Sequence, residues 1–457
     1  MIWLLACTSS EPEVPPAPPG AVAEHAGMGV WTRAPLDPVE GEILPYEGYT
    51  VRPVSLQVFE GYRVSAALWL PEEVKGGVLM AHGHFGQGKS SGEAQGPAHL
   101  YARNGYAVLA VDTPGVEEGD RPDRAIHFEA GATNRALLWA HGTSAMGVQL
   151  HGLHAGLDYL EGYTRRLAVA GSSGGAVQAL YVLLSDPRPQ AAVLASMVPV
   201  PREARASGCA CDVLPGWEGP DPALLASIDR PVLWMSEVEG TPRPLGLPEE
   251  SPYQVHPGPH GFEEPMQQAS LNFLEKHLGG GSTTYPPANT PESSLASKDV
   301  GPAGLAVLVS TFPAREAAPA SRKPPMTLDC DGSGPRVLTL GAEDQDRAAL
   351  KDFEVCAVQL RLDELGVTES LVRNEVYAGG MAAAVNEAGP GLVYAVGPWA
   401  VVAGMTGRPY VARSAQGSPG PDAPSWSVVP GFDYTYGDAL GVGEDPAALV
   451  DVLRSQQ

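Results

Sequence analysis

Short apolar runs alternate with amphipathic stretches through the first 280 residues of the chain. Residues 54–59 and 62–70 alternate in the manner of β-strands and are joined by Glu60-Gly61, a pair that suits a hairpin turn. Further strands are predicted at residues 77–81, 107–111, 167–170, 191–195, 232–236 and 253–256. Helices are predicted at residues 96–104, 144–160, 176–184 and 265–278. Buried strands separated by helices indicate a largely parallel sheet with helices on both faces.

One strand-to-helix junction carries a Gly-x-Ser-x-Gly pentapeptide, Gly171-Ser172-Ser173-Gly174-Gly175. On such a sharp turn the hydroxyl of the serine stands clear at the edge of the sheet. The N–H of Gly174 then lies at the positive end of the following helix, where it can hold an oxyanion. As a bare pentapeptide the segment could be an ordinary glycine-serine turn. The strand before it and the helix after it favour a nucleophile elbow, and the whole pattern predicts an α/β-hydrolase fold.

A serine hydroxyl becomes a good nucleophile only when a base takes its proton and an acid orients that base. In this fold the chain order is serine, acid, histidine. His260 follows the last predicted strand and precedes the last helix, which is the position expected of the base. His256 is the alternative, but it lies at the end of the strand itself.

The acid is expected in the loop that follows residues 232–236. This loop contains Glu237 and Glu239 and no aspartate. Glu237 still belongs to the end of the strand, whereas Glu239 lies inside the loop before Gly240, so we favour Glu239. Glu237, Asp212 or an inactive site remain open as alternatives.

The second oxyanion donor is expected in the loop His82-Gly83-His84-Phe85-Gly86, which follows the strand at 77–81. The backbone N–H of His84, or less favourably that of Phe85, would lie nearest Gly174. No carboxylate follows these histidines at the spacing of metal ligands, so we expect no metal here. His151 and His154 are interpreted as a solvated or locally hydrogen-bonded pair. No metal or organic cofactor is expected.

Composition divides the chain into four parts: a signal-like start and Pro-rich tether at 1–25, a catalytic domain at 26–280, a linker at 281–324 and a smaller α/β domain at 325–457. Within the linker, residues 305–310 are predicted to form a strand. In the last part we predict strands at 337–341, 355–360, 392–397 and 427–430 and helices at 375–387 and 446–453. Gly397-Pro398-Trp399-Ala400-Val401 stands where an elbow would be and offers no nucleophile, so this domain is predicted to be a non-catalytic relative of the first. An unrelated α/β cap remains open as the alternative.

The formal net charge of −24 argues against nucleic acid or anionic lipid as a partner. Leu4-Leu5-Ala6-Cys7 resembles the lipobox of bacterial lipoproteins, although six residues before the cysteine are fewer than a secretory signal requires. Two explanations fit this short segment. Either the start codon is placed too far downstream, or the N-terminus is simply apolar. We expect an exported protein that is anchored to the bacterial cell envelope through a lipidated Cys7. An oxidising compartment would allow two bridges among Cys209, Cys211, Cys330 and Cys356.

Several motifs in residues 54–278 together resemble bacterial α/β-hydrolases of the acetyl xylan esterase-like and dienelactone hydrolase-like groups. The matching segments are Gly83-His84 with Lys89, Arg103 to Val108, Ser144 to Gln149, Gly171 to Gln178 and Gly208 to Asp212. The resemblance implies that Ser173, rather than Ser172, is the nucleophile. The family carries Asp-Trp-Thr where this chain has Glu239-Gly240-Thr241, and Asn-Tyr where Gly261-Phe262 follows the histidine.

The sequence therefore predicts a serine esterase with the triad Ser173, His260 and Glu239. The resemblance implies short acyl groups, such as acetyl esters of carbohydrates, and a small-molecule or carbohydrate ester as substrate. One alternative is a peptidase of the prolyl oligopeptidase type, but the 40–50-residue repeats of a propeller are missing. Another is a non-catalytic surface lipoprotein that uses the hydrolase fold for binding.

Overall fold

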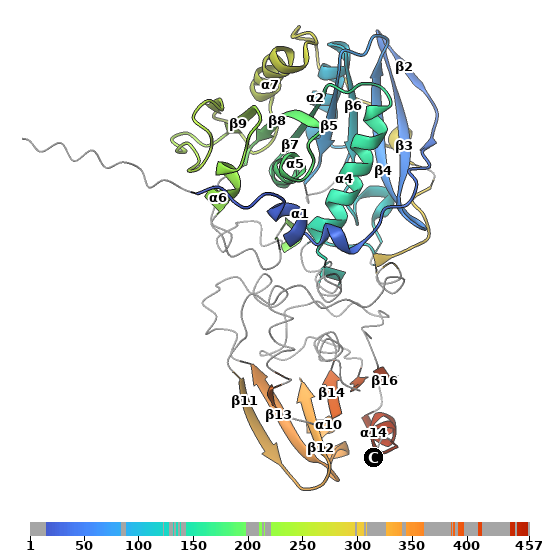
Figure 1. Ribbon diagram of the computed structural model, residues 1–457. Coiled ribbons are helices and arrows are strands. Elements are labelled where there is room, and N and C mark those ends of the chain that lie inside the picture. Colours follow the sequence, from blue (N-terminus) through green and yellow to red (C-terminus); the bar gives the residue numbers. More distant parts are fainter. Residues whose placement is uncertain are drawn as a thin grey trace, which may run out of the picture.

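Two β-sheets with associated helices make up the computed structural model (Figure 1). The residues that it describes are 15–83, 88–121, 123–127, 131, 134–135, 138, 143–197, 210–212, 214, 221–297, 299–305, 308, 326–340, 344–360, 385, 387–388, 392–396, 410–413, 439–443 and 446–455.

The larger sheet begins with an antiparallel hairpin and continues as six parallel strands. Its strands are β1 (Val39–Glu40), β2 (Leu44–Tyr46), β3 (Tyr49–Phe59), β4 (Tyr62–Pro71), β5 (Gly76–Ala81), β6 (Tyr106–Val111), β7 (Leu167–Ser172), β8 (Pro189–Ala195), β9 (Val232–Ser236) and β10 (Tyr253–Val255). From β3 onward they lie in the order β3-β4-β6-β5-β7-β8-β9-β10. Every residue of β5, β6, β7 and β9 is buried, as expected of a sheet covered on both faces.

The two faces of this sheet are covered by different helices. The helices are α1 (Ala21–His25), α2 (Gly92–Arg103), α4 (Ala145–Glu161), α5 (Gly174–Ser185), α6 (Asp221–Ala226) and α7 (Glu264–Leu278). Leu79 on β5 packs in one core with α1, α4 and α5, whereas its neighbour Val78 packs in another core with α2 and α7. Adjacent residues of a strand point to opposite faces, so the apolar run of β5 supplies both cores. Ser144 caps α4 as predicted, because its hydroxyl accepts the N–H of Gly147 at 3.0 Å.

The N-terminal tether is shorter than the sequence predicts. Its expected range, 1–25, includes α1, whose Ala21 and Val22 are buried in the core. The N–H of Ala17 donates to the carbonyl of Ala223 at 2.8 Å. The Pro-rich composition predicts a solvated segment, but its alanine and valine side chains are small and apolar enough to pack against the domain.

The prediction that residues 281–324 form a linker is wrong for the first part of this range. That part packs against the domain that contains the larger sheet. The N–H of Thr290 donates to Oε1 of Gln95 at 2.6 Å, and that of Leu305 to the carbonyl of Asp123 at 2.7 Å. Leu295 and Leu305 are buried in its two cores. This domain therefore extends well beyond residue 280.

Other predicted elements fall at the edge of the described chain or beyond it. Residues 305–310 are predicted as a strand, but Leu308 donates its N–H to the carbonyl of Gly304 at 3.0 Å, which is a helical bond. The strand at 427–430, the segment 397–401 and nearly all of the helix at 375–387 lie outside the described residues. Within the described part of the chain, none of the helices is both long and apolar enough to cross a bilayer.

The smaller sheet repeats the strand order of the larger one. Its strands are β11 (Met326–Asp331), β12 (Arg336–Leu340), β13 (Glu354–Leu360), β14 (Leu392–Val396), β15 (Tyr410–Arg413) and β16 (Ala439–Gly443), and its helices include α10 (Asp344–Ala349) and α14 (Pro446–Arg454). The order β11-β13-β12-β14-β15-β16, with only β11 antiparallel, corresponds strand for strand to β4-β6-β5-β7-β8-β9. In this correspondence β14 takes the place of β7. The lack of catalysis in this domain stays a prediction.

A disulfide joins Cys330 on β11 to Cys356 on β13, at paired positions of the two strands. It is one of the two bridges that the sequence allows. Cys211 is buried in the larger domain, and Cys209 lies outside the described residues.

Candidate active site

The predicted elbow joins β7 to α5 and holds Ser173 in a strained conformation. Its φ of 55° and ψ of −121° are rarely adopted by a residue with a side chain. The glycines of the motif are required by close packing. A Cβ on Gly171 would lie 2.2 Å from the carbonyl oxygen of Gly175, and one on Gly175 would lie 2.4 Å from that of Ala81. The backbone can therefore make this turn only with glycine at both positions.

His260 follows β10, and its Nδ1 lies 2.6 Å from Oε1 of Glu237. The Glu237 carboxylate is buried, with a side-chain exposure of 6%, whereas the His260 side chain is 52% exposed. The imidazole thus has one nitrogen fixed by a buried acid, and its remaining surface is open to a reactant. This is the arrangement that a general base requires.

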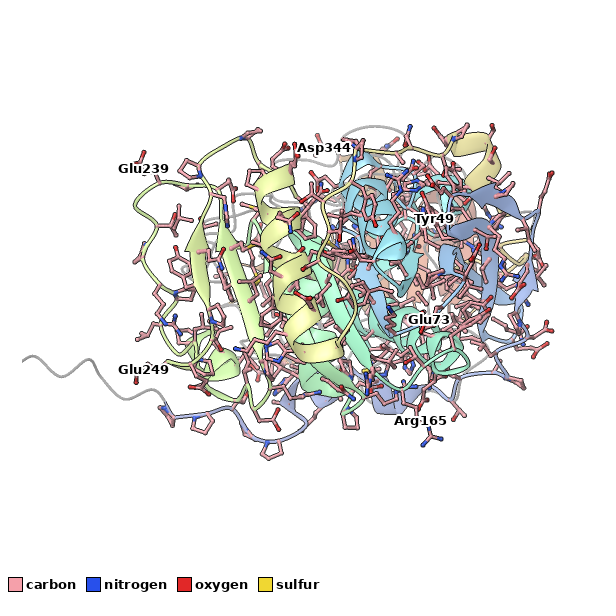
Figure 2. The ribbon with its side chains drawn as sticks, turned by 90° about the horizontal axis from the view of Figure 1, so that it is seen from above. Tyr49, Glu73, Arg165, Glu239, Glu249 and Asp344 are labelled. Atoms are coloured by element: carbon pink, nitrogen blue, oxygen red, sulfur yellow. A yellow bond between two sulfur atoms is a disulfide. The ribbon has the colours of Figure 1, made fainter. Side chains whose placement is uncertain are left out.

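This contact shows that the prediction of Glu239 as the partner of His260 is wrong, because Glu237 is the residue that meets the imidazole. Glu239 is exposed, and Figure 2 shows it at the periphery of the molecule. The loop turns tightly after β9, because the N–H of Thr241 donates to the carbonyl of Val238 at 3.2 Å. Glu239 therefore lies at the tip of the turn, while Glu237, at the end of the strand, lies next to the histidine.

His256 and Asp212, which the sequence leaves open as base and acid, take no part in this contact. Nε2 of His256 lies 3.0 Å from Oε1 of Gln254 on β10, so its imidazole contacts that amide rather than Glu237. Asp212 is buried in a 3-10 helix (η5, Ala210–Asp212). Of the two histidines, His260 is therefore the one that a buried carboxylate holds.

Ser196 links the histidine loop to the elbow, a role that its sequence position after an apolar run does not reveal. Its φ is 51°, and its hydroxyl donates to the carbonyl of Gly261 at 2.5 Å. The preceding residue, Ala195, accepts the N–H of Ser173 at 3.0 Å. The last residue of β8 and the one after it thus hold the backbones of the candidate nucleophile and of the residue next to the candidate base.

The candidate oxyanion donors differ in how far the structure describes them. Gly174 is the first residue of α5, but His84 and Phe85 lie outside the described residues. Gly83, just before them, runs beside the start of α5, because a Cβ on it would lie 3.4 Å from the Gly174 nitrogen. The carbonyl of His82 accepts Nε2 of Gln178 at 2.8 Å. The loop is therefore attached to the elbow helix on the side where the second donor is expected.

The two glutamines of the resemblance motifs brace this attachment. Nε2 of Gln178 lies 2.7 Å from Oε1 of Gln149, and Gln149 in turn donates to the carbonyl of Cys211 at 2.8 Å. All three residues are buried. The motifs that contain them therefore support the loop at His82 from behind.

Comparison with known proteins gives matches among solved structures only. No protein-family model matches the sequence, and no curated protein matches it. A methylesterase matches with a TM-score of 0.46 and 20% identity over 57% of this chain and 62% of its own, so this chain spans less than two thirds of its length. A glucuronoyl esterase from Solibacter usitatus matches with a TM-score of 0.41 and 14% identity, over 57% of this chain and 91% of its own. An acetyl xylan esterase from Paenibacillus sp. R4 has a TM-score of 0.41 and 15% identity, over 59% of this chain and 97% of its own.

The larger domain has the α/β-hydrolase fold. The strand order, the antiparallel β4 and the serine turn between β7 and α5 carry this assignment.

A buried lysine lies just before α2 in the larger domain, which we call the hydrolase domain after its fold. Lys89 is fully buried, and its Nζ lies 2.7 Å from Asp112, 2.5 Å from Glu117 and 2.7 Å from Glu118. Burial would lower the pKa of Lys89, but the three carboxylates outweigh it and raise it. Burial raises the pKa of Asp112 to about 7 even though Lys89 opposes it. The cluster fixes the start of α2 to the loop that follows β6.

Replacing Lys89 by methionine is expected to lower the free energy of unfolding of this domain by about 3 to 5 kcal/mol, because it leaves buried carboxylates without a counter-charge. Urea denaturation followed by tryptophan fluorescence measures the loss. Lys75→Met is the matched control: its ion pair with Glu73 is exposed, at 3.8 Å, and we expect a change below about 0.5 kcal/mol. Equal effects of the two substitutions would contradict the structural role of Lys89.

The groups of side chains that could hold a metal are otherwise engaged in the described residues. Lys89 contacts all three carboxylates of one group, Asp112, Glu117 and Glu118. The other group includes Cys330 and Cys356, which form the disulfide.

The histidine pair on α4 is neither solvated nor locally hydrogen-bonded, because both imidazoles are buried and bond to residues far away in the sequence. Nε2 of His151 lies 3.1 Å from the carbonyl of Met28, and Nε2 of His154 lies 3.0 Å from the hydroxyl of Ser185. Burial lowers the pKa of His151 to about 3 and that of His154 to about 4. Both imidazoles are therefore neutral core groups near pH 7.

Proposed function

We propose that this protein is a serine hydrolase that cleaves carboxylic esters through an acyl-enzyme. The contact between His260 and the buried Glu237 carries the proposal, because it completes a base and its orienting acid on the same sheet edge as the strained Ser173. The chain order of serine, acid and histidine is that of α/β-hydrolases. We expect no metal or organic cofactor to be needed.

Each residue has a definite role in the proposed reaction. Ser173 Oγ attacks the ester carbonyl while Nε2 of His260 takes its proton and then gives that proton to the leaving alcohol. Glu237 accepts the Nδ1–H of His260, which fixes the tautomer and stabilises the imidazolium. The N–H of Gly174 and that of His84 are proposed to hold the oxyanion. Water, activated by His260, then releases the acyl group and restores Ser173.

The proposed substrates are esters with short acyl groups, in particular acetyl esters of carbohydrates. This follows from the motifs that the chain shares with acetyl xylan esterase-like hydrolases, including Gly171 to Gln178. We also propose that the protein is exported and lipid-anchored to the cell envelope through Cys7, which lies outside the described residues. The disulfide between Cys330 and Cys356 supports an oxidising compartment.

A fluorophosphonate probe tests the proposal, because it reacts with activated serines and not with ordinary hydroxyls. The full chain should be labelled once, and mass spectrometry of its peptides should place the label on Ser173. The neighbouring Ser172 provides the matched control: Ser172→Ala should keep the label and Ser173→Ala should lose it. Absence of labelling, or labelling at a different serine, would refute the proposed nucleophile.

A further inference from the structure

We infer that Glu93 and Glu263 select substrates by charge, so that esters with neutral or cationic groups are preferred over anionic ones. The inference rests on the proposed function and names a substrate class for the same site. Glu93 lies in the first turn of α2, and Glu263 directly precedes α7. Neither residue belongs to the proposed triad.

Both carboxylates lie beside the backbone that carries the proposed base. A Cβ on Gly261 would lie 2.9 Å from Oε1 of Glu93 and 3.5 Å from Oε1 of Glu263. Gly261 follows His260 directly, so a substrate group that reaches His260 from this side passes close to two carboxylates. Both residues are exposed to solvent over part of their surface.

The electrostatic environment of Glu93 contains little positive charge. Partial burial raises the pKa of Glu93, and His260 acts in the opposite direction. A hydrogen bond with Ser172 also lowers this pKa, whereas the acids Glu263 and Glu237 raise it. Lys89, four residues before Glu93 in the sequence, is already surrounded by three carboxylates.

A crevice between α2 and α7 shares Glu263 with this acidic surface. It has a volume of about 760 Å³, and segment 284–289 forms one of its walls. Among the described residues, its lining includes Glu263 and Glu264 as well as the uncharged Gln95, Gln267 and Tyr285, and no lysine or arginine. A nearby cation is Arg103, whose guanidinium lies over the ring of Tyr285, 5.4 Å from its centre. This size suits a small molecule or a sugar unit. Amide, tyrosine and carboxylate groups can bind hydroxyl-rich or cationic groups, whereas an anionic group would be repelled.

The test compares three acetate esters that differ in charge and little in shape: 4-acetoxybenzamide, 4-acetoxybenzoate and 4-(trimethylammonio)phenyl acetate. Each kcat/KM is divided by the rate of alkaline hydrolysis of the same ester, which removes differences in intrinsic reactivity. We expect the neutral and cationic esters to be preferred over the anionic one by about tenfold or more at low salt. The preference should shrink in 0.5 M NaCl, because exposed charges are screened.

Charge-removing variants identify the source of the preference. In the double variant Glu93→Gln with Glu263→Gln, the preference for neutral and cationic esters over the anionic one should fall to about twofold. The change should come mainly from faster hydrolysis of the anionic ester. Glu73→Gln, which removes an exposed carboxylate before β5, should leave it unchanged. An unchanged preference in the double variant, or equal rates for the three esters in the wild-type protein, would overturn the inference. Loss of all Ser173-dependent hydrolysis would instead overturn the proposed function on which it rests.

Discussion

Replacing Ser173 by alanine is expected to lower kcat for p-nitrophenyl acetate by roughly 10⁶-fold, as loss of the nucleophile does in serine hydrolases. The hydroxyl forms the covalent acyl-enzyme, and none of the described neighbours can replace it. Ser172 precedes it in the sequence but belongs to β7 and is buried. Ser172→Ala should therefore keep kcat within about tenfold of the wild-type value.

The measurement should include the double variant Ser173→Ala with His260→Ala. Because the serine and the histidine act as a unit, the double variant should be about as inactive as the single Ser173→Ala variant. Circular dichroism checks that each variant is folded. A Ser173→Ala protein that retains kcat would contradict the acyl-enzyme mechanism.

Replacing Glu237 by glutamine is expected to lower kcat by roughly 10⁴-fold. Glutamine has nearly the same shape, but it is uncharged and can hold His260 in the wrong tautomer through its amide group. Because the Glu237 carboxylate is buried and the contact is only 2.6 Å long, water cannot easily take the place of this acid. The loss should appear in kcat with p-nitrophenyl acetate, measured from pH 6 to 9.

Glu239→Gln is the matched control, since Glu239 lies two residues further along the same loop and is exposed. It should leave kcat within about twofold of the wild-type value. A large fall in kcat with Glu239→Gln and an unchanged kcat with Glu237→Gln would assign the acid to Glu239 instead.

The strands and the elbow of the hydrolase domain could be predicted because their signals are local. An uninterrupted apolar run such as residues 107–111 can hardly be anything other than a buried strand in this context, and the structure places β6 at Tyr106–Val111. His260 could be located from its place between β10 and α7. The acid that contacts His260 could not be identified from the sequence, because the loop after β9 turns within a few residues. Which of two glutamates faces the histidine depends on that turn, and counting from the strand does not reveal it.

The boundaries of the domain could not be predicted for a different reason. Composition shows that residues 281–305 are rich in proline, serine and threonine, which is typical of a linker. Whether such a segment packs depends on a few side chains, here Leu295 and Leu305, and on the surface that receives them. The smaller domain shows the same limit, since β15 and β16 are short and carry glycine or polar residues that weaken the apolar pattern.

The attachment of residues 281–305 to the hydrolase domain matters for anyone who wishes to produce that domain alone. A fragment that stopped after the glycines at 279–281 would lose Leu295 and Leu305, and the apolar surface beneath them would face water. Such a fragment would tend to aggregate even though it kept Ser173, Glu237 and His260. An expression boundary beyond residue 308 retains the segment 281–305 together with the domain that it covers.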